Sequence, residues 1–227
     1  AKNDIVGRLR EALCSKEVGP GDRADLGFAL GRLLVAKGDF DEAYTVYTAA
    51  NQASRASLGP GFRGYDPQSH ERFVDRLIEV FSQPCIAAAP APEGAPPIFI
   101  CGMFRSGSTL TERILAGHSR VSAGGELDLI PSLLGSVLRP YPEAATDPRA
   151  ITRARDAYMD GLNSIRPAGK IITDKRPDNF LHIGLIKAMF PDARIVHTHR
   201  APLDNLLSLY FLHLDPSMAY ALDLKDA

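Results

Sequence analysis

An eight-residue stretch, GMFRSGST at 102–109, combines backbone geometry and donor side chains that suit phosphate binding. It follows a short apolar run and precedes a helical pattern, so successive backbone N–H groups and the positive end of a helix point at one spot. Gly102 and Gly107 permit backbone angles that are closed to other residues. The side chains that can donate to an anion are Arg105, Ser106, Ser108 and Thr109. We therefore expect a phosphate site in this loop.

The same stretch nearly matches GxxxxGK[ST], the loop of nucleotide triphosphatases. Ser108 stands where that pattern has its Lys, so the charge that reaches the β- and γ-phosphates is missing. This departure disfavours a nucleotide kinase or triphosphatase but leaves phosphate binding intact. The structural alternative is a glycine-rich turn that only joins a strand to a helix.

Three strand–loop–helix units are expected to hold this loop in place. Short apolar strands that alternate with helices favour parallel pairing with right-handed crossovers. We therefore predict an α/β fold in which helices flank a parallel sheet with a loop like that of the triphosphatases. The expected strands are 97–102, 170–174 and 193–199, and the expected helices are 108–118, 178–190 and 202–214.

The first third of the chain is expected to be helical. Apolar spacing over 24–56 fits two helices that turn at Gly38, and a further helix is expected over 69–81. Five prolines between Pro84 and Pro97 argue against a helix or a central strand there. The predicted division is a helical region at 1–83, a Pro/Ala-rich linker at 84–96 and the α/β domain at 97–227.

Charge and hydropathy exclude several classes of partner. The chain has 26 Lys and Arg against 27 Asp and Glu, a formal charge of −1 that argues against broad binding of nucleic acid or anionic lipid. Its apolar runs fall short of the roughly 20 residues that span a bilayer, and its start lacks a signal-peptide apolar region. We expect a cytoplasmic protein without a membrane or nucleic-acid partner.

The cysteine content also fits the expectation of a cytoplasmic protein. They are odd in number, lack CxxC spacing and suit a reducing environment, so we expect inert thiols. These residues are Cys14, Cys85 and Cys101. Because the chain begins without Met and ends abruptly at LDLKDA, we also expect a fragment that is incomplete at its C-terminus.

GMFRSGSTL, together with ITDKRPDNFLHIGLIKAMFPDARIVHTHRAPLDNLLSLY, resembles the sulfotransferases over about 97–220. Within them it is similar to the tyrosylprotein-sulfotransferase-like branch and its bacterial relatives that carry tetratricopeptide repeats. The helical pair at 24–56 resembles one such repeat, although Gly27 replaces the usual Trp and Arg55 the usual Pro. The positions that match the repeat are Leu30, Gly31, Leu34, Ala43, Tyr47 and Ala50. An ordinary helical hairpin that buttresses the next domain is the alternative.

The resemblance implies a cofactor, 3′-phosphoadenosine-5′-phosphosulfate (PAPS), with 3′,5′-adenosine bisphosphate as product and no metal. Residues 105–109, which are Arg105, Ser106, Gly107, Ser108 and Thr109, would bind the 5′-phosphosulfate. Arg200 and Ser208, eight residues apart at a strand end and on the following helix, would bind the 3′-phosphate.

The resemblance also implies the groups that carry the chemistry. Glu126, which lies 21 residues beyond Arg105, would be the general base, although it could instead cap a helix expected over 127–138. Lys175, 25 residues before Arg200, would share with Arg105 the charge that develops in the transition state.

The histidines offer a rival base. Cytosolic small-molecule sulfotransferases use a His, but we expect His118 to be a structural residue at a helix end. His197 and His199 alternate on an expected strand without a third ligand, so we expect no metal site.

These patterns predict a sulfotransferase that moves a sulfuryl group from PAPS to a hydroxyl or phenol on a small molecule or peptide. A protein partner could bind through the helical repeat. The alternative is a non-catalytic nucleotide-binding scaffold with a degenerate sulfotransferase fold. Phe104 in place of a Pro and the missing C-terminal elements motivate that alternative. Ala201 also replaces the Asp that follows the family's Arg at position 200.

Overall fold

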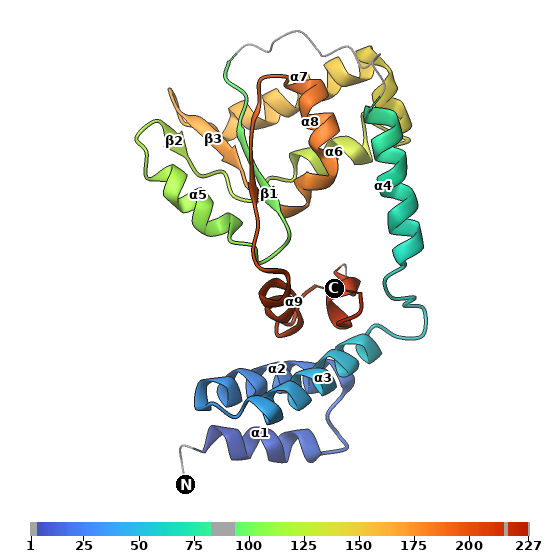
Figure 1. The fold of residues 1–227 in the computed structure, drawn as a ribbon, viewed down its shortest axis with the longest axis vertical. Helices are drawn as coiled ribbons and strands as arrows, with labels where there is room; N and C mark the ends of the chain where they lie inside the picture. The colour runs from blue at the N-terminus through green and yellow to red at the C-terminus, as the bar shows by residue number, and fades with distance from the viewer. Residues whose placement is uncertain (1–3, 83–93, 216–217, 227) are drawn as a thin grey trace. The chain divides into compact units, whose positions relative to one another are not determined.

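Four parallel strands form a sheet in the computed structural model, which describes residues 4–82, 94–215 and 218–226 (Figure 1). In spatial order the strands are β2 (Val121–Ser122), β3 (Ile171–Asp174), β1 (Ile98–Gly102) and β4 (Arg194–Thr198). Because the strands are parallel, their carboxyl ends meet at one edge of the sheet, where ligands of open α/β sheets bind. The loop that follows β1 therefore leaves the sheet beside the end of β4.

Helices connect the strands of the sheet and flank it, which confirms the predicted α/β fold. Between β1 and β4 the helical segments are α5 (Ser108–Ala116), α6 (Leu129–Gly135), η1 (Glu143–Thr146), α7 (Pro148–Ile165), η2 (Pro177–His182) and α8 (Ile183–Met189). After β4 come α9 (Pro202–Tyr210) and η3 (Ala219–Leu222). Asp147 caps the N-terminus of α7, because its side chain accepts a hydrogen bond from the Arg149 backbone N–H at 2.9 Å.

Some predicted boundaries were wrong. The helix expected over 178–190 is a 3₁₀ turn followed by the short helix α8, with His182 at the junction. The helix expected over 127–138 begins only after Asp128 and ends at Gly135. The long helix α7 and the two-residue strand β2 were not predicted.

Aromatic side chains make the centre of the α/β core. The ring centroids of Phe99 on β1 and Tyr158 on α7 lie 5.9 Å apart, and those of Tyr158 and Phe190 lie 5.3 Å apart. All three side chains are almost fully buried. Burial of this much aromatic surface packs α7 firmly against β1, the strand that leads into the loop at 102–109.

The N-terminal region is helical, as expected. It consists of α1 (Ile5–Cys14), α2 (Pro20–Lys37) and α3 (Phe40–Ser57). Gly38 ends α2 in the left-handed conformation at φ +86°, which makes the predicted turn. A Cβ at Gly31 would lie 2.6 Å from the Tyr47 ring, so the glycine lets α2 and α3 approach closely. Whether this pair is a tetratricopeptide repeat stays a prediction.

Contacts group the chain into two units, 1–67 with 201–227, and 68–200. The C-terminal segment packs on the helical pair in the first unit, where the rings of Tyr47 and Phe211 stack at 4.4 Å. Asn51 Nδ2 also donates to the Tyr210 carbonyl at 2.9 Å.

This grouping differs from the predicted division. Helix α4 (Pro67–Phe81) falls almost entirely in the α/β unit, whereas α9 falls in the helical one. The predicted boundaries at 83 and 97 stay a prediction, and most of the proposed linker, residues 83–93, lies outside the described residues.

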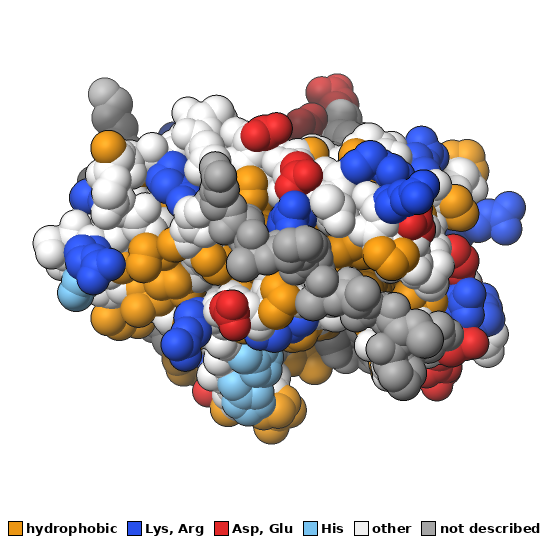
Figure 2. All heavy atoms as spheres, turned by 90° about the horizontal axis from the view of Figure 1, so that it is seen from above, with side chains coloured by type: hydrophobic (Ala, Val, Ile, Leu, Met, Phe, Trp, Pro, Cys, Tyr) orange, Lys and Arg blue, Asp and Glu red, His pale blue; other side chains and the backbone are white. Residues whose placement is uncertain are grey.

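The surface carries charges of both signs. Figure 2 shows Lys and Arg side chains interspersed with Asp and Glu on the face that it displays, which accords with the formal net charge of −1. Within 4–82, 94–215 and 218–226, every helix is too short or too polar to cross a membrane.

Candidate active site

The loop after β1 makes a close approach to β4 at Gly102. A Cβ at this position would lie 2.3 Å from the Thr198 carbonyl oxygen, and Gly102 has φ +144°. Any side chain would therefore push the two strand ends apart. Arg105 has a left-handed backbone at φ +69°, a conformation uncommon outside glycine and often associated with functional sites.

Hydroxyl groups tie the loop to the end of β4. Ser106 Oγ and Thr198 Oγ1 share a hydrogen bond of 2.7 Å, and Thr198 Oγ1 also donates to the Cys101 carbonyl at 3.2 Å. The Ser106 backbone N–H donates to the Met103 carbonyl at 3.1 Å, which closes the turn. The loop is thus held by several polar contacts rather than being a loose connection.

Helix α5 begins directly from this loop. Gly107 precedes its first residue, Ser108, and the Thr111 backbone N–H donates to the Gly107 carbonyl at 3.0 Å. Ser108 is buried, whereas Thr109 and Arg105 are exposed. A helix N-terminus with hydroxyl groups beside it is an arrangement suited to an anion, and the predicted phosphate site stays a prediction.

Glu126 and Lys175 form an ion pair at the same edge of the sheet. Lys175 directly follows β3, and its ammonium group donates to Glu126 Oε1. The Lys175 side chain is 8% exposed and that of Glu126 is 50% exposed, so part of the carboxylate remains accessible to solvent. Glu126 does not cap the next helix, because Asp128 takes the N-cap position of α6.

Arg200 follows β4 two residues beyond Thr198 and is exposed. It therefore lies in the α/β unit, near the strand end that contacts the loop. Ser208 lies on α9, in the helical unit, and its predicted role with Arg200 at a 3′-phosphate stays a prediction.

Comparison with known proteins decides the family, because residues 96–221, more than half of the chain, match the model described as the Sulfotransferase family. This chain belongs to the sulfotransferase family. An uncharacterized protein of Aquifex aeolicus (strain VF5) is 34% identical over 243 aligned positions, which cover 99% of this chain and 31% of the relative. The chain thus spans about a third of that relative. No solved structure gave a significant match.

The three histidines that the sequence singled out in this sulfotransferase-family chain are His118, His197 and His199, and the ion pair of Glu126 and Lys175 involves none of them. His118 Nδ1 accepts from the Arg120 backbone N–H at 3.1 Å, a contact that shapes the turn between α5 and β2. His197 and His199 are exposed on either side of the buried Thr198. Within the described residues, no three His, Cys, Asp or Glu side chains are grouped so that they could hold a metal ion.

The cysteines that the structure describes have ordinary surroundings. Cys14 is exposed and Cys101 is buried in β1. Burial raises the pKa of the Cys101 thiol to about 11, so it is protonated at neutral pH. Cys101 is therefore a core residue of the family domain and a poor nucleophile, while Cys85 lies outside the described residues.

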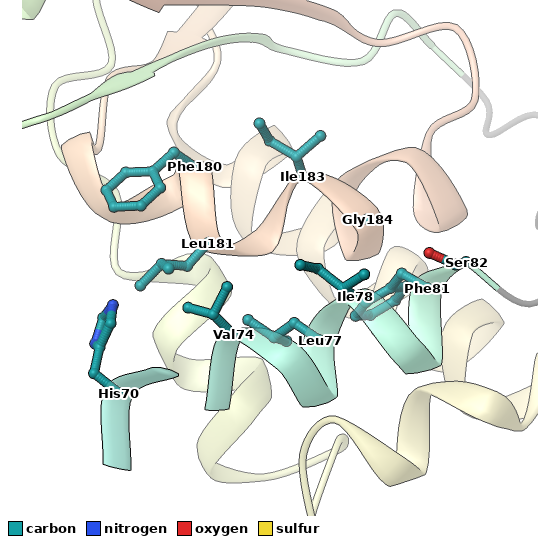
Figure 3. A pocket seen from close by; sticks show the side chains of 10 residues that line it. All are labelled: His70, Val74, Leu77, Ile78, Phe81, Ser82, Phe180, Leu181, Ile183 and Gly184. Carbon is teal, nitrogen blue, oxygen red and sulfur yellow. The ribbon is translucent and has the colours of Figure 1, made fainter. Parts of the chain in front are cut away.

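An apolar hollow of about 330 Å³ lies between α4 and the η2–α8 segment (Figure 3). Phe81 packs at Gly184, where a Cβ would lie 2.4 Å from the ring. The predicted site residues of the sulfotransferase domain do not line this hollow. Its lining residues are His70, Val74, Leu77, Ile78, Phe81, Ser82, Phe180, Leu181, Ile183 and Gly184.

Two buried carboxylates beside the site were missed from the sequence. Asp174 directly precedes Lys175 and accepts from the Tyr158 hydroxyl at 2.7 Å. Burial raises the pKa of Asp174 to about 6. The other is Glu112 on α5, which is 5% exposed. A signal existed for Asp174, since an acidic residue ends the apolar strand KIITD, but nothing in its local pattern distinguished Glu112 from a solvent-facing helix residue.

Proposed function

We propose that this domain transfers a sulfuryl group from PAPS to a hydroxyl or phenol. Membership of the sulfotransferase family implies sulfuryl transfer, and the donor, the acceptor and the residue roles are our proposals. The observation that carries the proposal is the Glu126–Lys175 ion pair at the sheet edge that also carries the loop of Arg105. A base, a cation and an anion-binding loop at one edge are what sulfuryl transfer needs.

The residues of the loop fit a phosphosulfate group. Gly102 leaves no room for a side chain at the strand end, and Gly107 exposes backbone donors at the start of α5. Arg105, Ser106, Ser108 and Thr109 would bind the 5′-phosphosulfate, and Arg200 with Ser208 the 3′-phosphate. PAPS, when bound, supplies the sulfuryl group and the phosphate oxygen from which that group departs.

The chain's own side chains would manage the proton and the charge. Glu126 would accept the proton from the acceptor hydroxyl as the new oxygen–sulfur bond forms and the bridging bond breaks. Lys175 and Arg105 would donate hydrogen bonds to the bridging oxygen and the sulfuryl oxygens, and would so stabilise the negative charge that develops on them. Fixed donors of this kind can stabilise a transition state by several kcal/mol.

Placement in the tyrosylprotein-sulfotransferase-like branch is part of the proposal. It is supported by Glu126, rather than a His, as the carboxylate that pairs with the strand-end Lys175. The acceptor would be a small molecule or a peptide, and the helical pair α2–α3 could bind a protein partner. The buried Tyr47 and Ala50 are consistent with a repeat-like pair.

The test uses the full-length protein, sulfur-labelled PAPS and a panel of phenols, alcohols and tyrosine peptides. Labelled acceptor together with stoichiometric 3′,5′-adenosine bisphosphate is the expected result. Binding of the bisphosphate without transfer to any acceptor would overturn the proposal and favour a non-catalytic nucleotide-binding scaffold. Turnover of ATP in place of PAPS would favour a nucleotide kinase or triphosphatase.

A further inference from the structure

Glu112 is a buried carboxylate on the helix that begins from the anion-binding loop. It lies on α5 and is 5% exposed, although its neighbours Arg113 and Ile114 are exposed. Burial of a carboxylate costs several kcal/mol unless hydrogen bonds compensate it. A buried Glu at this position therefore requires hydrogen-bond donors around its carboxylate.

Those partners come from two other parts of the domain. Glu112 Oε1 accepts a hydrogen bond from the Gly125 backbone N–H at 3.0 Å and from Thr173 Oγ1 at 2.6 Å. Thr173 Oγ1 in turn accepts from the Gly124 backbone N–H at 3.1 Å. The carboxylate thus accepts from two donors, and an apolar side chain in its place would leave the buried Thr173 hydroxyl and the partly buried Gly125 N–H without this acceptor.

The same network fixes the turn immediately before Glu126. The Lys175 backbone N–H donates to the Gly125 carbonyl at 2.9 Å. A Cβ at Gly124 would lie 2.1 Å from the Thr173 carbonyl oxygen, so the turn touches β3 and has no room for a side chain. The turn at 124–125 is therefore bonded to α5 on one side and to β3 on the other.

We propose that Glu112 is a positioning residue that sets Glu126 against Lys175. It acts through Gly125, which precedes Glu126, and through Thr173, which lies two residues before Lys175. It also ties both groups to the helix that carries the anion-binding loop. This inference rests on the proposed function, because it concerns the placement of the proposed base and cation.

The test compares Glu112→Ala and Glu112→Gln with wild type in the full-length protein. Ala removes the acceptor, whereas Gln keeps an amide oxygen for the two donors. Arg113→Ala, an exposed change on the same helix, is the matched control. For Glu112→Ala we expect kcat to fall by roughly 100-fold, since small misplacements of reacting groups cost that much, with KM for PAPS and bisphosphate affinity nearly unchanged.

Hydrogen exchange gives a second readout that does not depend on turnover. We expect the amide of Gly125 to exchange faster in Glu112→Ala, and Glu112→Gln to restore both slow exchange and most of kcat. A kcat within twofold of wild type in Glu112→Ala would overturn the inference. So would unchanged exchange at Gly125, or a loss of kcat that Gln fails to restore in a folded variant.

Failure of the proposed function gives a different result. If the wild type transfers no sulfuryl group, the proposed function and the catalytic part of this inference both fall, whatever the variants do. If the wild type is active but Glu112→Ala loses bisphosphate affinity in proportion to kcat, then Glu112 supports the loop instead, and the positioning role alone is overturned.

Discussion

Lys175 donates a hydrogen bond to the carboxylate of Glu126, so the proposed cation and the proposed base are one ion pair. The two residues reach each other from different segments, one at the end of β3 and the other after the turn at 124–125. The buried ammonium needs this partner, because an unpaired buried charge is costly. Any change at one of these residues therefore alters the electrostatics of the other.

The first prediction concerns the base. Glu126→Gln should lower kcat for sulfuryl transfer by roughly 10² to 10⁴, the usual contribution of a general base, while bisphosphate affinity stays within a few-fold of wild type. Steady-state kinetics and calorimetry measure the two quantities. Asp128→Asn is the control, since Asp128 is a nearby, largely exposed carboxylate that pairs with Arg176. Equal activity of Glu126→Gln and wild type would remove Glu126 from the mechanism.

The second prediction concerns the phosphate contacts. Arg105→Ala and Arg200→Ala should each weaken binding of 3′,5′-adenosine bisphosphate by roughly 10- to 100-fold, as expected when a charged hydrogen bond is lost. Calorimetry at constant ionic strength measures the affinity. Arg194→Ala is the control, because Arg194 is exposed at the opposite end of β4. If Arg194→Ala weakens binding as much as the other two, general electrostatic attraction explains the affinity and the local phosphate site does not exist.

The third prediction tests the close approach at the loop. Gly102→Ala should destabilise the domain by about 2 kcal/mol or more and abolish bisphosphate binding, because its Cβ would overlap the Thr198 carbonyl oxygen. Gly135→Ala should change stability little, since nothing lies within 4 Å of a Cβ there. Thermal unfolding with and without bisphosphate checks both variants. A Gly102→Ala variant that unfolds and binds like wild type would refute this reading of the loop.

Local patterns predicted the parts of the fold that depend on neighbouring residues. The apolar run of β1, the glycine-rich loop and the start of α5 are contiguous, so the sequence revealed them together. The turn at Gly38 was likewise readable. The strand β2 has only two residues and carries no periodicity. The helix α7 was missed although Asp147 and Pro148 are start signals and its apolar residues recur at helical spacing.

The contacts within the site were beyond sequence patterns. Glu112 bonds to Gly125 and Thr173, which lie 13 and 61 residues away, and a lone Glu in a helical pattern ordinarily indicates a solvent-facing position. The intervals that selected Glu126 and Lys175 came from the resemblance to sulfotransferases. Their ion pair depends on the packing of the 124–125 turn against β3, which a sequence pattern does not encode.

The fourth prediction concerns Asp174. Burial raises the pKa of Asp174 from 3.8 to about 6. At a pH between these two values, the folded state therefore keeps a proton on Asp174 that the unfolded chain has already released. Its contribution to stability is therefore largest below pH 3.8 and is lost as pH rises to about 6. Relative to wild type, Asp174→Asn should gain about 2 to 3 kcal/mol in unfolding free energy between pH 4 and pH 7. Denaturant unfolding measures this difference, and a pH-independent difference would contradict it.

The fifth prediction has the opposite sign and concerns His182, whose side chain is buried and shares a 3.1 Å hydrogen bond with the Tyr141 hydroxyl. Burial lowers the pKa of His182 from 6.5 to about 4, so the unfolded chain binds a proton before the folded state does. The stability from neutral His182 is present above pH 6.5 and is lost as pH falls to about 4. Relative to wild type, His182→Asn should therefore gain about 3 kcal/mol on going from pH 7 to pH 4. Denaturant unfolding at the two pH values measures this gain, and a difference between His182→Asn and wild type that is the same at pH 7 and pH 4 would contradict the prediction.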